Sequence, residues 1–160
     1  MGAWVVKVAS RHGADDPRLL KLSSIFQQFV VQLTCHMQKE ETVLSPLCRQ
    51  MEQGTFNPAE SHCGSVQNPI RVMMSEHDDA GEALEQIAQL TDNFTPSADA
   101  CNTYRAMLDG LAHLRRDMHQ HVHKENNILF RRVITFWERG KISTAVDATL
   151  HAPLSDGAKR

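Results

Sequence analysis

Apolar residues recur every three or four positions along most of this chain, which is the period of an amphipathic α-helix and not the alternation of a β-strand. Glycine and proline fall mostly between these periodic segments. The pattern predicts long helices over residues 17–53, from residue 69 to between residues 90 and 93, and over 97–137, after a first helix over 3–12. We therefore expect an all-α chain folded as an up-and-down four-helix bundle with a shortened first helix.

Residues that start and stop helices support these boundaries. Gly13 suits a helix C-terminus, and Asp16 followed by Pro17 supplies an N-cap and a proline at the first helical position. Residues 54–68 form a predicted loop, Gly140 ends the fourth helix, and a short last helix over 142–150 is compatible with the pattern. We expect one metal-binding bundle over residues 1–152 and a flexible tail over 153–160.

Ionisable residues interrupt the apolar stripes near the middle of the long helices. The stripe of the second helix turns polar at His36 and Glu40, between Leu33 and Leu44. His77 occupies the corresponding position in the third helix. In the fourth helix the stripe reads Met107, Leu111, Leu114, Met118, His121, Glu125 and Leu129. Polar residues therefore stand on three helices where core residues are expected.

A buried carboxylate or imidazole costs several kcal/mol unless it is paired or binds a metal. A single histidine on an apolar stripe is more often a satisfied core residue than a ligand. Two His-x-x-x-Glu pairs and a third central histidine, all in phase with separate stripes, instead predict a shared metal site. The two carboxylates can bridge two cations, and mixed imidazole and carboxylate ligation favours iron, manganese or zinc over calcium or magnesium.

Composition and charge narrow the functional classes. The 160 residues suffice for one domain, and a formal net charge of -2 without a basic block argues against a nucleic-acid partner. The short, charge-interrupted N-terminal segment does not resemble a signal peptide, and no apolar window is long enough for a membrane span. We expect a cytoplasmic protein.

The four cysteines lack CxxC spacing, and the chain has enough apolar residues that a disulfide framework is not needed. We therefore expect reduced thiols. Cys35 and Cys101 fit as small core residues, whereas the exposure of Cys63 in the predicted loop is left open.

The sequence resembles the hemerythrin-like di-iron proteins that repair iron-sulfur clusters after nitrosative and oxidative stress. The resembling segments cover almost all of the chain from His12 to about Val133, and several are longer than a pair of metal ligands. They are His36-Met37-Gln38-Lys39-Glu40-Glu41, Asn68-Pro69-Ile70, Val72-Met73-Met74-Ser75-Glu76-His77-Asp78, Ala100-Cys101 and His121-Val122-His123-Lys124-Glu125-Asn126-Asn127-Ile128-Leu129-Phe130.

The resemblance implies a set of ligands to a non-haem di-iron centre. The terminal ligands would be His12, His36, His77 and His121, and the bridging carboxylates would be Glu40 and Glu125. Considered alone, His12 lies at a predicted helix end, where an imidazole can instead pair with terminal carbonyls. Manganese or zinc at the site stays open.

The sequence also departs from the family pattern. Family members add a histidine on the first bundle helix and a small N-terminal domain with a cysteine pair, and neither has a counterpart here. The departures imply an open position on one iron and an uncovered part of the core. An apolar groove edged by Trp4, Val5 and Val8 would favour a homodimer.

The family role implies repair of damaged iron-sulfur clusters, by iron supply or by nitric oxide handling at the di-iron site. The chemistry would be redox and ligand exchange and not hydrolysis, and no catalytic residue is predicted apart from the metal ligands. The expected partners are damaged iron-sulfur proteins as iron acceptors, with nitric oxide or dioxygen as small ligands. Two alternatives stay open: a reversible dioxygen or nitric oxide carrier or sensor, and a metal-deficient truncated bundle that acts as an interaction protein.

Overall fold

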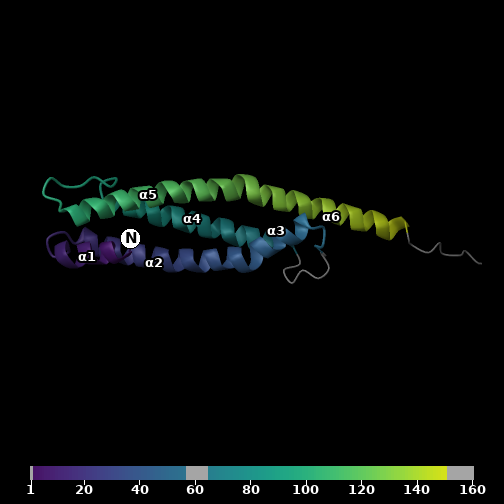
Figure 1. Cartoon of the computed structure of the whole chain (residues 1–160), viewed down its shortest axis with the longest axis horizontal. Coiled ribbons are helices and arrows are strands. Elements are labelled where there is room, and N and C mark those ends of the chain that lie inside the picture. Colours follow the sequence, from purple (N-terminus) through teal and green to yellow (C-terminus); the bar gives the residue numbers. More distant parts are fainter. Residues whose placement is uncertain (1, 57–64, 151–160) are drawn as a thin grey trace, which may run out of the picture.

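The computed structural model describes residues 2–56 and 65–150, with side chains through residue 140. Figure 1 shows an elongated bundle in which long helices run side by side and α6 extends beyond their end. The elements are α1 (Gly2–His12), α2 (Arg18–Lys39), the π-helical turn η1 (Glu40–Leu44), α3 (Ser45–Glu52), α4 (Gln67–Leu90), α5 (Asn102–Lys124), the π-helical turn η3 (Glu125–Leu129) and α6 (Phe130–Leu150). The described residues contain no strand, so the all-α, hemerythrin-like bundle prediction is confirmed.

The second helix agrees closely with its prediction. It begins at Arg18 and continues without a break through α2, η1 and α3. The backbone N–H of Arg18 donates a hydrogen bond to Asp16 Oδ1 at 3.0 Å, so Asp16 satisfies one of the free amides of the first turn. The N-cap itself is Pro17 and the first helical residue is Arg18, so the predicted capping position, Asp16, is wrong by one residue.

The fourth helix differs from its prediction at both ends. It begins at Asn102 and not near residue 97, and α6 continues through Gly140 to Leu150 and absorbs the separate last helix expected over 142–150. A Cβ atom added at Gly140 would meet nothing within 4 Å. A glycine in such an open helical position costs only about 1 kcal/mol, which does not end the helix. The predicted tail over 153–160 lies outside the described residues.

The first helix is short but well packed. Val5 and Val8 are 1% and 2% exposed and belong to a core cluster that also contains residues of α2, α4 and α5. Trp4 is 46% exposed. The prediction that Val5 and Val8 edge an exposed groove is therefore wrong, because the apolar face of α1 already packs against its neighbours.

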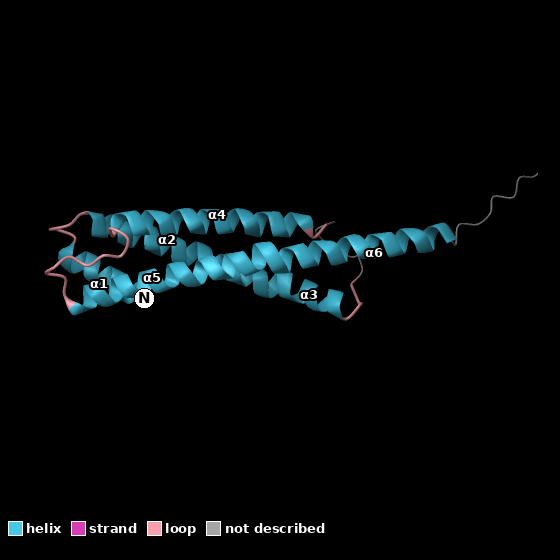
Figure 2. Ribbon diagram, turned by 90° about the horizontal axis from the view of Figure 1, so that it is seen from above, coloured by secondary structure: helices cyan, strands magenta, loops and turns pink. Residues whose placement is uncertain are grey.

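Polar residues separate the apolar clusters along the bundle axis. One cluster lies around α1, and another packs α3 and the start of α4 against α6. Among the described residues, the buried polar side chains are those of His36, Glu40, His77 and Thr91. Figure 2 shows how α2, α4 and α5 run together through the middle of the molecule. His36 belongs to α2, Glu40 begins η1, and His77 belongs to α4. None of the described helices has the length and apolar character needed to cross a membrane.

The cysteines differ in part from their prediction. Cys35, Cys48 and Cys101 are free, in agreement with reduced thiols. Cys35 and Cys101 are exposed, so the interpretation of both as small core residues is wrong. Cys35 lies on the outer face of α2, and Cys101 immediately precedes α5. Cys63 lies outside the described residues.

Candidate metal centre

Five of the six predicted ligands meet in the middle of the bundle. One ligand atom from each lies within 4.8 Å of every other: the five are His36, Glu40, His77, His121 and Glu125. They come from α2, η1, α4, α5 and η3, so the cluster joins segments far apart in sequence. The helical period placed these residues on the core stripes of separate helices, and packing the stripes together forms the cluster.

Both glutamates begin a π-helical turn. Glu40 starts η1 and Glu125 starts η3, and the carbonyl of each accepts a hydrogen bond from the residue five positions later. A π-helical turn inserts an extra residue into an α-helix, and such turns occur frequently at functional sites. In each helix the turn changes the helical phase directly after the His-x-x-x-Glu pair. It thus keeps the pair on the inner face while the following residues pack differently.

The ligand atoms are spaced as they would be around a shared cation. His36 Nε2 lies 3.0 Å from Glu40 Oε1, His77 Nε2 lies 3.1 Å from Glu125 Oε2, and the two Nε2 atoms are 3.1 Å apart. His121 Nε2 is 3.5 Å from both carboxylate oxygens. Ligands about 2.1 Å from one metal lie about 3.0–3.4 Å from each other in octahedral or tetrahedral geometry. The spacing therefore fits a metal without rearrangement.

Neighbouring oxygens set the tautomers of the two inner histidines. Glu76 Oε2 accepts a hydrogen bond from His36 Nδ1 at 2.8 Å, and Asn126 Oδ1 accepts one from His77 Nδ1 at 2.8 Å. An oxygen acceptor at Nδ1 leaves the Nε2 lone pair free for a metal. Lys39 pairs with Glu76. Burial alone would raise the pKa of Glu76, but hydrogen bonds from Lys39 and His36 hold it below its usual value, so the carboxylate stays charged.

Buried polar atoms without hydrogen-bond partners provide the test of metal fit. Among the described residues these are Glu40 Oε1, His121 Nε2 and Glu125 Oε2, all of which point into the cluster. An unsatisfied buried polar atom costs about 1–3 kcal/mol, and more when it is charged. A cation would satisfy all three at once. The donor set therefore fits a metal with imidazole and carboxylate ligands such as iron.

The two carboxylates interact strongly without a cation. Burial and the proximity of Glu125 raise the pKa of Glu40. Burial acts in the same direction on Glu125, but the proximity of His77 and Glu40 lowers its pKa overall. Burial alone would lower the pKa of His77, yet the proximity of Glu125 and the contact with Asn126 raise it. Protons thus compensate the carboxylate charge, and a metal would replace them.

The ligands of the cluster differ in exposure. His36 and His77 have side chains only 4% and 1% exposed, whereas His121 is 32% exposed. A cavity of about 670 Å³ has His121 and Glu125 in its wall, together with apolar side chains from η3 and α6 that include Val133. A small ligand can therefore reach the cluster from the α5 side.

His12 does not join the cluster. Its Nε2 atom lies 3.8 Å from Cys101 Sγ, at the end of the bundle where α5 begins. Cys101 precedes His121 by 121 − 101 = 20 residues, so α5 separates the two positions by about 30 Å. The prediction of His12 as an iron ligand is wrong for this structure. The number of residues between His12 and His36 matches the family pattern, but it does not determine where His12 lies along the bundle axis. In the structure His12 lies beside the start of α2.

Sequence reasoning missed the residues around the ligands. Glu76 and Asn126 each stand beside a predicted ligand in the chain and off the apolar stripe, so they passed as surface residues. Their adjacency to His77 and Glu125 was the available signal. Each of these residues binds the histidine of a neighbouring helix and not the ligand beside it in the chain. Glu76 contacts His36, and Asn126 contacts His77.

Comparisons with known proteins agree with this geometry. The hemerythrin HHE cation binding domain matches residues 3–133. The "Iron-sulfur cluster repair protein YtfE" of Enterobacter sp. (strain 638) is 47% identical over 103 residues, which are 64% of this chain and 42% of that protein. A "Probable iron-sulfur cluster repair protein" of Haemophilus influenzae is 38% identical over 128 residues, 80% of this chain and 53% of that protein. The chain spans about half the length of these relatives.

Proposed function

The chain belongs to the hemerythrin HHE family, and from that premise we propose that it is a non-haem di-iron protein that takes part in the repair of damaged iron-sulfur clusters. The observation that carries the proposal is the convergence of five ligand atoms within 4.8 Å, three of them buried without a hydrogen-bond partner. The names of the relatives support the repair role. The metal-binding part of the proposal rests on this chain's own residues.

Each residue has a defined task in this proposal. Glu40 and Glu125 would bridge two irons, and His36, His77 and His121 would be terminal ligands. Glu76 and Asn126 hold the inner imidazoles with Nε2 toward the metals. When bound, the irons would supply redox chemistry and exchangeable positions for nitric oxide or dioxygen. Iron can also be the cargo, passed to a damaged iron-sulfur protein.

The exposure of His121 supports a role in exchange. A ligand that is one-third exposed beside a cavity is easier to displace than one sealed in the core. We propose that iron leaves, and that small ligands enter, past His121. The expected partners are iron-accepting apo-proteins in the cytoplasm.

The first test is metal content. The anaerobically purified chain is analysed for iron, manganese and zinc, and its absorption spectrum is taken before and after exposure to air. About two irons per chain and oxo-bridge absorption after oxidation are expected for a di-iron centre. Glu40→Ala should lose most of the iron, whereas Glu41→Ala, at the exposed neighbouring position, should keep it. Equal iron in both variants would refute the assignment.

The second test concerns repair. The iron-loaded chain is mixed with an apo-protein that assembles a cysteine-ligated cluster, in the presence of sulfide, and cluster absorption is followed. Cluster formation that depends on Glu40 supports iron supply. No transfer from a fully loaded chain would contradict that role.

One observation favours a second function. Apolar side chains of η3 and α6, those of Ile128, Leu129, Val133 and Phe136, form part of the wall of the 670 Å³ cavity beside His121. That apolar part suits a small uncharged gas, which supports reversible dioxygen or nitric oxide binding. A chain that keeps both irons through repeated gas cycles and transfers none would be a carrier or sensor. A chain that binds no metal and has unchanged thermal stability after chelation would be an interaction protein.

A further inference from the structure

A histidine and a cysteine that the proposed metal centre does not use meet at the other end of the bundle. Cys101 Sγ lies 3.8 Å from His12 Nε2, although the two residues are 89 positions apart in the chain. That distance is within hydrogen-bonding range for sulfur. A thiol beside an imidazole can transfer its proton to the ring, and the resulting thiolate is the nucleophilic form.

The fold holds His12 in place. The carbonyl of His12 accepts hydrogen bonds from the amides of Asp15 at 3.1 Å and Asp16 at 2.9 Å. Gly13 allows the chain to turn here, because a Cβ atom at that position would lie 2.4 Å from the carbonyl oxygen of Ala9. The His12 ring stacks on Tyr104 with a centroid distance of 6.1 Å and an interplanar angle of 28°. The imidazole is therefore positioned before any reaction.

Cys101 stands at the positive end of α5. It has an extended backbone directly before the helix, and its side chain makes no capping hydrogen bond, so the sulfur is available to His12. The Arg105 guanidinium donates to the carbonyl oxygens of Ala100, Ser97 and Ala98 and adds positive charge nearby. Cys101 is exposed, so a reagent can reach it.

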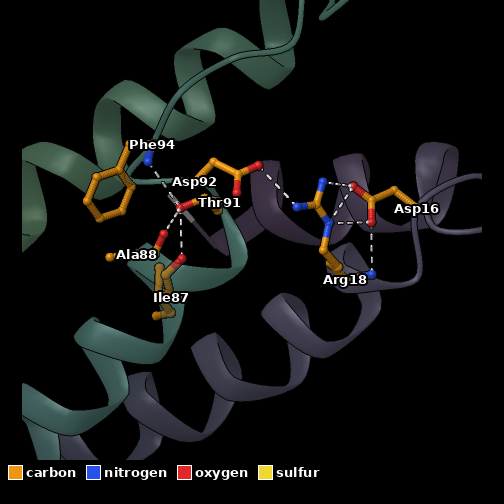
Figure 3. A network of polar contacts seen from close by, with 7 residues as sticks. All are labelled: Asp16, Arg18, Ile87, Ala88, Thr91, Asp92 and Phe94. Atoms are coloured by element: carbon orange, nitrogen blue, oxygen red, sulfur yellow. Dashed lines mark hydrogen bonds and ion pairs between the residues drawn. The ribbon is translucent and has the colours of Figure 1, made fainter.

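Charges of both signs surround the pair. A cavity of about 430 Å³ includes His12 and Ala100 in its wall, and the charged or ionisable side chains around it are those of Asp15, Asp16, Arg18, Asp92, Asp99 and Tyr104. Arg18 bridges Asp16 and Asp92, which ties the start of α2 to the loop after α4 (Figure 3). The four carboxylates outnumber the single guanidinium, and Arg18 is already paired with two of them.

We propose that His12 and Cys101 form a reactive thiol site for low-molecular-weight disulfides. His12 takes the proton from the Cys101 thiol, and the thiolate attacks one sulfur of the disulfide. A new S–S bond forms to Cys101, the original S–S bond breaks, and the departing thiolate takes the proton from His12. Cys101 is thereby oxidised to a mixed disulfide, and half of the reagent is reduced to a thiol.

The experiment compares the thiols within one protein. The full chain is treated with iodoacetamide at pH 7 and separately with glutathione disulfide, and each cysteine is quantified by peptide mass spectrometry. Cys101 should react about tenfold faster than Cys35, which is also exposed but lies inside α2. Glutathione disulfide should add a glutathionyl group to Cys101 first. Equal rates at the two cysteines, or no mixed disulfide at Cys101, would overturn the proposal.

A variant then tests the imidazole. His12→Gln should slow Cys101 alkylation at pH 7 to near the rate of Cys35, but leave it unchanged at about pH 10, where thiols are ionised without help. His113→Gln, an exposed histidine of α5, is the matched control and should change neither rate. Equal loss at both pH values would mean a structural role only and would refute the thiol–imidazole pair. The comparison of Cys101 with Cys35 in the wild-type protein tests the reactivity of Cys101 whether or not the variant folds.

Discussion

The bundle contains two polar clusters in which histidine and carboxylate side chains from distant segments meet. The central cluster consists of His36, Glu40, His77, His121 and Glu125, and the end cluster consists of the residues around His12, Asp16, Arg18, Thr91 and Asp92. The two clusters differ in burial. In the central cluster, His36 and His77 are nearly sealed, and three ligand atoms have no hydrogen-bond partner. In the end cluster, Arg18 is 51% exposed, and it pairs with both Asp16 and Asp92. Ion pairs and solvent exposure satisfy the charged groups of the end cluster, whereas the central cluster has three buried atoms that a cation would satisfy. Burial, and not residue type, therefore separates a metal site from an ordinary polar surface.

The largest expected difference in iron binding is between removal of a histidine from the central cluster and removal of one from the end cluster. His36→Ala should weaken iron binding by more than about 100-fold, because loss of a ligand exceeds the 10–100-fold cost of losing a residue that only supports one. His12→Ala should leave iron binding unchanged, because His12 contacts Cys101 at the far end of α5. Iron titration under anaerobic conditions, with elemental analysis of the loaded protein, measures both. Loss of iron in His12→Ala would contradict the assignment of metal binding to the central cluster alone, and His12 would then count as an iron ligand.

Sequence reasoning succeeded where periodicity alone determines position. The helical period placed His36, His77 and His121 on core stripes, and buried polar residues in phase with one another predicted the cluster. His12 failed because its assignment rested on spacing relative to a family pattern. The predicted helix boundaries already placed it before the start of α2. The first residue of α2, Arg18, is 36 − 18 = 18 residues before His36, which is about 27 Å along the helix.

The rest of the site depends on geometry that a linear pattern does not contain. The contact between Glu76 and His36 depends on the packing of α4 against α2, and the sequence shows only that Glu76 precedes His77. The two π-helical turns were equally hidden, since they alter hydrogen bonding without a distinctive residue type. Gly140 misled in the opposite way, because a single glycine does not stop a helix when no other signal ends it.

A smaller effect sharpens the comparison within the central cluster. Glu76→Gln should weaken iron binding by about 10–100-fold, because the neutral amide holds His36 Nδ1 less strongly than the carboxylate. Glu85→Gln on the same helix is the matched control, because Glu85 pairs with Arg115 at 2.8 Å and contacts no ligand in that pairing. Competition with a chromophoric chelator measures both affinities. Equal affinities would show that Glu76 does not support the site.

Within the end cluster, substitution of the buried polar residue Thr91 should lower the stability of the fold most. Thr91 is 3% exposed, and its hydroxyl donates to the Ile87 carbonyl at 2.7 Å and accepts the Phe94 amide at 3.3 Å (Figure 3). Thr91→Val should destabilise the fold by about 1–3 kcal/mol, because it leaves these groups unsatisfied. Thr34→Val removes a similar 2.7 Å bond to Val30 on an exposed face and should cost less than about 0.5 kcal/mol. Urea unfolding measures both values, and equal costs would contradict the role of burial.

The smallest effect is expected at Arg18, although its ion pairs look strong in the structure. Arg18 bridges Asp16 at 2.9 Å and Asp92 at 3.1 Å, but solvent screens these exposed charges. Arg18→Gln should lower the melting temperature less than Thr91→Val does, and the difference from wild type should vanish in about 1 M salt, where the screening length is about 3 Å. Arg116→Gln on α5 controls for the loss of one positive charge. If Arg18→Gln still lowers the melting temperature in high salt, the contacts of Arg18 stabilise the fold through packing and not through charge. Exposure would then not explain the difference between the two clusters.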